Sequence, residues 1–133
     1  MAQHDIHNLL NGAIGRNISA ISSSTTTNGN IIDTQGYGAV EAFLLTGAYT
    51  DGTYVLSWSV GDDSGLSDGA APSSDDVIGS ASLAAANGVK RLGYVGNKRY
   101  VRPVITSTGV TSGATVGVLV VRGKPNVGPA AAN

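Results

Sequence analysis

Two histidines, His4 and His7, lie three residues apart near the N-terminus and are the only imidazoles in the chain. One helical turn would bring side chains at that spacing to a single face, as a pair of metal ligands requires. The chain has no cysteine, which excludes disulfides, thiolate nucleophiles and cysteine-type zinc sites. Two ligands without a third make a poor metal site, so the pair is better explained as polar residues of an arm.

Three short motifs resemble parts of known sites but lack their partners. Asp63-Ser64-Gly65 matches the surroundings of the nucleophile in trypsin-like proteases, whose chemistry also needs a histidine held by an acid. Gly36-Tyr37-Gly38 lacks the third glycine and the helix of a dinucleotide site. A group of acids fails the spacing of a calcium loop: Asp62, Asp63, Asp68, Asp75 and Asp76. We expect no catalytic, cofactor or metal site, and no enzymatic activity.

Basic residues gather in the last third of the chain. Seven of the eight lie between Lys90 and Pro125: Lys90, Arg91, Lys98, Arg99, Arg102, Arg122 and Lys124. Tyr94 and Tyr100 are interleaved with them and would suit stacking on single-stranded nucleic acid. A pI of about 6 and an aromatic content of 5% disfavour that partner. Cations that protect an edge strand are an alternative. We favour ion pairing with a protein partner.

The net charge of −1 conceals a strong asymmetry between the two parts of the chain. Residues 1–76 hold all nine acids and one base, whereas residues 77–133 hold seven bases and no acid. If neighbouring strands mix the two parts, the charges pair across the sheet, and exposed pairs contribute little, about 0–1 kcal/mol each. If the parts segregate, the molecule has a dipole suited to head-to-tail packing or to an acidic surface. We expect mixing.

The bulk composition indicates one domain with an unusually uncharged surface. A chain of 133 residues can close a single core. Only 13% of its residues are charged, about half the usual share. Such surfaces often lie against other protein. The sequence has no apolar run long enough for a transmembrane helix and no pattern of a signal peptide, so we expect a protein used in cytoplasm or carried in a particle assembled there.

Period-two alternation predicts strands along most of the chain. In residues 53–60 the core face comprises Tyr54, Leu56, Trp58 and Val60. Later core faces comprise Val101, Pro103 and Ile105, and then Val116, Val118 and Val120. Residues 39–49 are apolar on both faces, which indicates a strand buried in a sandwich or at a subunit contact. Asp51-Gly52, between two such runs, predicts a hairpin.

About seven short strands with frequent turn signals predict an all-β fold, a single-domain β-sandwich or jelly roll. We expect residues 1–12 to form a flexible N-terminal arm, 13–125 the β-sandwich domain and 126–133 a flexible C-terminal tail. Pro103 lacks a ladder donor, so an edge or a bulge is expected there.

Several segments together resemble a known family. These are Asp33 to Tyr37, Asp51 to Tyr54, Gly61 to Ser64, Val77 to Gly79, Lys90 to Arg102 and Gly123 to Pro125, spread over roughly residues 25–125. The chain resembles the small all-β head proteins of tailed double-stranded-DNA bacteriophages that decorate or cement the capsid. The segment from Lys90 to Arg102 is the most specific. The matching motifs are structural, so no catalytic residue carries over.

The resemblance implies a structural virion protein that binds the outside of a capsid and stabilises subunits of the major capsid protein. It implies self-association as a dimer or trimer, and a location in the virion. From the residues themselves we expect no cofactor and no membrane partner, and we expect a nucleic-acid partner to be disfavoured. Two alternatives stay open: another virion component from tail, connector or host-binding apparatus, or a carbohydrate-binding sandwich that uses Trp58 or tyrosines as a sugar platform.

Overall fold

The computed structural model describes residues 7–125, which form ten strands and two short 3-10 helices. In chain order these elements are η1 His7–Leu9, β1 Leu10–Ile21, β2 Thr26–Asn28, β3 Ile32–Asp33, β4 Tyr37–Tyr49, β5 Thr53–Gly61, η2 Ser74–Asp76, β6 Val77–Ile78, β7 Ala81–Leu83, β8 Val89–Tyr94, β9 Tyr100–Thr108 and β10 Ala114–Pro125. The predicted all-β class is confirmed.

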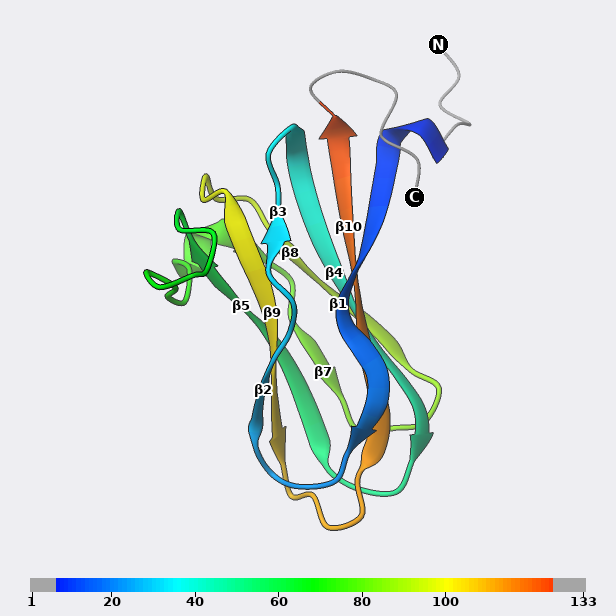
Figure 1. Cartoon of the computed structure of the whole chain (residues 1–133). Coiled ribbons are helices and arrows are strands. Elements are labelled where there is room, and N and C mark those ends of the chain that lie inside the picture. The colour runs from blue at the N-terminus through cyan, green and yellow to red at the C-terminus, as the bar shows by residue number, and fades with distance from the viewer. Residues whose placement is uncertain (1–6, 126–133) are drawn as a thin grey trace.

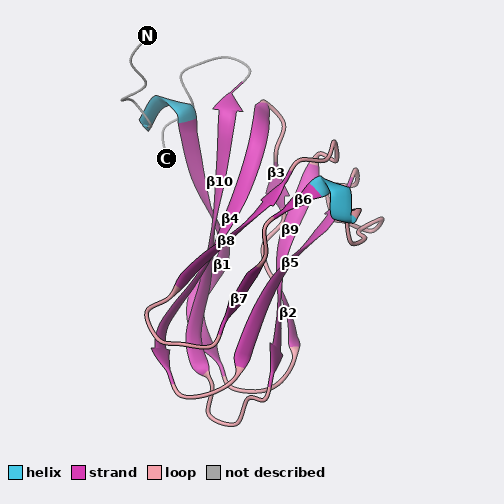
Figure 2. Cartoon of the chain, turned by 180° about the vertical axis from the view of Figure 1, so that it is seen from behind, coloured by secondary structure: helices cyan, strands magenta, loops and turns pink. Residues whose placement is uncertain are grey.

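The strands form two antiparallel sheets that pack face to face, as Figures 1 and 2 show. Sheet A has the order β1-β10-β4-β8-β6, and sheet B has the order β2-β9-β5-β7, with β3 beside β9. The pairs are nested: β1 with β10, β2 and β3 with β9, β4 with β8, and β5 with β7. A ribbon of nested pairs that wraps into two layers is a jelly roll.

The side chains that period-two alternation predicted to be buried fill the space between the two sheets. Tyr54, Val101 and Val116 have no exposed surface, and Trp58 is only 3% exposed. The core faces predicted for residues 53–60, 101–105 and 116–120 are confirmed, as is that of Val40, Ala42 and Leu44 in β4. Burial of such side chains is the main favourable term in folding.

The Asp51-Gly52 turn does not make the hairpin that its sequence predicts. β4 belongs to sheet A and β5 to sheet B, so the turn carries the chain from one sheet to the other. Gly52 has a φ of +99°, which satisfies the need for a glycine in a tight turn. The Asp51 carboxylate accepts hydrogen bonds from the N–H groups of residues 111–113 in the β9–β10 connection. The prediction was wrong because turn residues fix a reversal of the chain, not the sheet that receives it.

Pro103 lies in β9, which has neighbours on both sides and is therefore not an edge strand. Its carbonyl accepts a hydrogen bond from Gly29 N at 2.8 Å, in the gap where β2 has ended and β3 has not begun. The ring nitrogen, which has no hydrogen to donate, faces the same gap. The irregularity expected at this proline thus falls in the neighbouring strand.

At the N-terminal end, β1 begins at Leu10, so the strand includes the last three residues of the segment assigned to an arm. Residues 1–6, and the whole of the tail predicted for 126–133, lie outside the described residues. Within residues 7–125, no helix has the length and apolar character needed to cross a bilayer.

Candidate interaction surfaces

The motifs that could have carried chemistry serve as turns. The Asp63 carboxylate accepts hydrogen bonds from the N–H groups of Ser67 and Gly65, at 3.2 and 2.9 Å, and these bonds lower the pKa of Asp63. Asp68 likewise accepts from the N–H groups of Asp62 and Asp63, which lower its pKa. Within residues 7–125, no group of three or more potential ligands is placed to hold a metal ion. His4 lies outside that range.

Three ion pairs connect the acidic and basic parts of the chain. Lys98 Nζ lies 2.9 Å from Asp62 Oδ2, Arg99 Nη2 lies 2.8 Å from Asp33 Oδ2, and Arg91 Nε lies 4.0 Å from Glu41 Oε2. In each pair the acid comes from residues 1–76 and the base from residues 77–133. The expected mixing of charges is confirmed for these pairs. All six side chains are exposed by a third or more, so each pair contributes little to stability.

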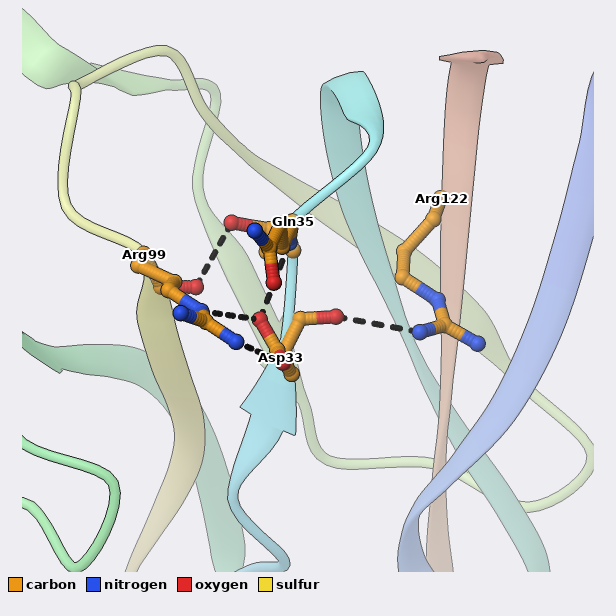
Figure 3. Close-up of polar contacts among 5 residues, drawn as sticks. Asp33, Gln35, Arg99 and Arg122 are labelled. Carbon is orange, nitrogen blue, oxygen red and sulfur yellow. Dashed lines mark hydrogen bonds and ion pairs between the residues drawn. The ribbon is translucent and has the colours of Figure 1, made fainter. Parts of the chain in front are cut away.

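Asp33 is the centre of a polar cluster that involves both sheets (Figure 3). Arg99 donates to both of its carboxylate oxygens, from Nε at 2.9 Å and from Nη2 at 2.8 Å. This bidentate bond is the main reason why the pKa of Asp33 is lowered. Arg122 reaches from β10 of sheet A to the Asp33 carbonyl in β3 of sheet B, at 3.0 Å. The cluster therefore connects the two sheets at one end of the sandwich.

The seven bases predicted to bind a partner do not form one surface. Arg122 is bound within the chain, and Lys98 and Arg99 are paired with acids. Lys90 and Arg91 lie on β8 in sheet A, whereas Arg102 lies on β9 in sheet B. Among the described residues, Lys90, Arg102 and Lys124 make no ion pair. Lys90 and Lys124 are exposed and available to a partner.

The outer face of sheet A is apolar, and we call it the apolar face. The β pairing arranges its side chains in three rows across the strands. They are Ile14, Leu119, Phe43 and Arg91; Ile18, Gly117, Leu45 and Val89; and Gly12, Val121, Glu41, Gly93 and Ile78. Ile18 is 68% exposed, Ile78 61%, Val89 58% and Ile14 50%. Eight large apolar side chains thus face outward on one sheet.

The outer face of sheet B is mostly polar, in contrast to that of sheet A. Its outward positions are mostly hydroxyl side chains: Ser57, Ser59, Ser82, Thr26 and Thr106, with Val55 and Val104 among them. Antiparallel sheets with one solvated face normally alternate apolar and polar residues in this way. Sheet A departs from that pattern, and contiguous apolar surface of this kind marks interaction sites.

A groove of ≈ 590 Å³ opens on the apolar face between β4, β8 and β6. Phe43, Ile78 and Val89 supply its apolar walls, and Glu41, Lys90 and Arg91 supply its charged groups. Gly93, in β8 between β4 and β6, adds no side chain to fill this space. Sequence reasoning identified residues 39–49 as apolar on both faces but did not identify the contributions of β1, β6 and β8.

Trp58 does not form a sugar platform, because its side chain is packed in the core beside Tyr94, with ring centroids 6.4 Å apart. The tyrosines of the described residues are buried or half-buried. A carbohydrate-binding surface would need a ring exposed on the outside, so this alternative loses the residues that motivated it.

Comparison with known proteins gives a likeness to solved structures. No family model matches the sequence, and no curated protein matches it. Among solved structures, the fold is similar to that of the SPBc2 prophage-derived protein YomS, with a TM-score of 0.45 and 13% sequence identity. The alignment covers 84% of this chain and 92% of that chain. At this level the likeness concerns the course of the backbone and says nothing about function.

Proposed function

We propose that the protein is a structural virion component that binds the outside of a bacteriophage capsid and holds neighbouring subunits of the major capsid protein together. The observation that supports the proposal is the apolar face, since eight outward apolar side chains on one sheet favour burial in an assembly of protein chains, copies of this chain included. The motifs between Asp33 and Pro125 resemble phage head decoration proteins, and this resemblance is the reason to propose a phage capsid as the particle. Such a role requires no catalytic group.

Cementing works through area and repetition. A specific interface buries about 1,600 Å² in total, and a copy at every equivalent position of a shell multiplies a modest affinity. The jelly roll suits this role because its many long-range strand pairs make one rigid body. The fold alone does not decide the matter, since jelly rolls occur in viral capsid proteins and in lectins alike.

The available cations supply a candidate contact with an acidic capsid surface. The seven bases were proposed to bind this partner, but Lys98 and Arg99 already neutralise Asp62 and Asp33. Their replacement by glutamate would place carboxylates side by side and disturb the loop itself. Lys90 and Lys124 make no such pair, so Lys90→Glu with Lys124→Glu is the cleaner test of docking.

The test of function is the copy number in purified virions, measured by quantitative mass spectrometry against the major capsid protein. We expect a ratio near a simple fraction of one, which corresponds to hundreds of copies in each particle. A dozen copies or fewer would assign the protein to the tail, connector or host-binding apparatus instead. Absence from virions would refute a virion role.

A second assay addresses attachment directly. Capsids that lack the protein are mixed with the purified wild-type chain or with the Lys90→Glu/Lys124→Glu variant, and occupancy is measured after sedimentation. We expect saturable binding of the wild type and weaker binding of the variant, with a larger difference at low salt. Equal occupancy of the two proteins would refute the electrostatic part of the proposal.

A further inference from the structure

We propose that a second copy of this chain covers the apolar face, with sheet A packed against sheet A about a twofold axis. This inference is independent of the capsid, since such a dimer would form in solution. It follows from the apolar composition, the charge and the area of the face, and from the bulges and covered carbonyls of the edge strand β1.

The shape of the face suits interdigitation with another sheet. Ile18 and Ile78 project from it, at 68% and 61% exposure, while Gly12 and Gly93 add no side chain to the row that ends in Ile78. The groove beside Phe43 offers ≈ 590 Å³. Packed sheets lie about 10 Å apart with their side chains interdigitated, so apolar projections of one copy can fill the groove of the other.

The charges of the face fit a second copy as the occupant. Glu41 and Arg91 are the charged groups of the three rows and lie on adjacent strands, and Lys90 lines the groove beside them. A twofold axis that passes between Glu41 and Arg91 brings the Glu41 of one copy towards the Arg91 of the other. A face that carries both signs is then self-complementary in a twofold interface. The existing contact of 4.0 Å is loose and leaves the Arg91 side chain 76% exposed.

The area of the face matches the need of a dimer. β1, β10, β4, β8 and β6 hold 12, 12, 13, 6 and 2 residues, 45 in all. Each residue of a sheet covers about 16 Å² of its face, because strands lie about 4.8 Å apart and rise about 3.3 Å per residue. The flat projection of the sheet is therefore roughly 700 Å². Projecting side chains make its accessible surface larger than this projection, so the face is large enough for the roughly 800 Å² of accessible surface that each partner contributes to a standard interface.

Association through the edge of sheet A is opposed by the structure of β1. Asn30 donates from its backbone N–H to the Gly15 carbonyl at 2.6 Å and from Nδ2 to the Ile14 carbonyl at 2.9 Å, which covers the middle of the strand. The register of β1 is also broken on both sides of Arg16. Bulges and covered carbonyls are the means by which proteins protect an edge from pairing. At the β1 edge, therefore, the face and not the strand is left for a partner.

The test is the oligomeric state of the isolated protein, measured by analytical ultracentrifugation from 1 to about 100 µM. Wild type is expected to be a dimer. Leu45→Glu places a charge on the central strand of the face, and Val55→Glu places one on the outer face of sheet B, where Val55 is 41% exposed. We expect at least a tenfold weaker dimer for Leu45→Glu and no change for Val55→Glu, with circular dichroism used to show that both are folded.

Charge exchange tests the twofold arrangement without any change in apolar packing. Arg91→Glu places acids opposite acids and is expected to weaken the dimer at least tenfold, whereas an equimolar mixture of Arg91→Glu and Glu41→Arg chains is expected to restore it as a heterodimer, which the intrachain pair alone could not do. A wild-type chain that stays monomeric at 100 µM would overturn the proposal and assign the face to a different protein. A trimer, or a dimer that Leu45→Glu leaves intact, would also overturn it.

Two single-cysteine variants give a further measurement, because the chain itself contains no cysteine. Phe43→Cys lies on the central strand of sheet A and is expected to form an intermolecular disulfide under mild oxidation. Val104→Cys lies on the outer face of sheet B and is expected not to. Faster cross-linking of the sheet B variant would contradict the proposed interface.

Discussion

Arg122 offers a sharp test of how the two sheets are joined. Its guanidinium donates to the Asp33 carbonyl at 3.0 Å and to the Asn11 side-chain oxygen, and its Cζ lies 4.9 Å from the centroid of the Tyr37 ring. Hydrogen bonds that involve a charged group contribute about 1.5–3 kcal/mol each, and a cation–π contact about 0.5–1 kcal/mol. Against these stands a buried Nε without a partner, which costs about 1–3 kcal/mol.

The change to make is Arg122→Met, which keeps an unbranched apolar stem and removes the guanidinium with its donors. The terms above leave a net loss of about 2–4 kcal/mol in the free energy of unfolding. For a domain of this size that corresponds to a fall in Tm of roughly 10 °C. Thermal and urea unfolding of the two proteins, followed by circular dichroism, would measure the loss.

Arg102→Met is the matched control. Arg102 also has a buried Nε without a partner, but it makes no ion pair or hydrogen bond within the described residues. Its replacement is therefore expected to change stability by less than about 1 kcal/mol. If Arg122→Met proves as stable as Arg102→Met, the bridge between β10 and β3 does not stabilise the fold and the reasoning fails.

Two further predictions concern the turns. Gly109 and Gly113 both have positive φ, +66° and +95°, but a Cβ at Gly109 would meet nothing within 4 Å, whereas one at Gly113 would lie 2.0 Å from the Ile21 carbonyl oxygen. Gly109→Ala should lower the free energy of unfolding by about 1–2 kcal/mol, and Gly113→Ala should lower it by clearly more. Urea unfolding of the two variants measures both losses, and equal losses would contradict the predicted clash at Gly113. Hydrogen bonds from the N–H groups of residues 112, 113 and 111 lower the pKa of Asp51, so its contribution is complete above the unfolded pKa of about 3.9 and is lost as the pH falls through the folded pKa. Wild type should therefore lose more stability than Asp51→Asn between pH 4 and pH 2, and parallel pH profiles would exclude this role for the carboxylate.

The sequence predicted which residues are buried far better than which strands are neighbours. Alternation in β5 and β10 records burial directly, since one side of each strand faces the core. The sequence contains no comparable signal for which strands pair with each other. Asp51-Gly52 reverses the chain, but β4 and β5 both have a long apolar face, and the two faces meet across the core, not side by side.

The same limit explains why the seven basic residues, which are close in the sequence, do not form one surface. Residues 90–124 look like one basic segment in the sequence, but β8, β9 and β10 fall alternately in sheets A, B and A. Successive strands of a jelly roll change layer, so Lys90 and Arg102 end on different sheets. The acids that pair with Lys98 and Arg99 come from residues 62 and 33, at a separation in sequence that no local pattern could indicate.

The apolar face was visible in the sequence only where the strand is regular. In β4 the outward Phe43 and Leu45 alternate with inward residues, and the pattern correctly indicated a strand apolar on both sides. In β1 Ile14 and Ile18 are exposed and Ile21 is buried, and the register breaks on both sides of Arg16 interrupt the alternation, so the spacing of these isoleucines reads as irregular. Hydroxyl side chains occupy most of the equivalent outward positions on sheet B, so the jelly roll does not itself require apolar residues there. In the proposed dimer the exposed isoleucines of sheet A are covered, and the hydration cost of leaving them uncovered would be the driving force for that contact.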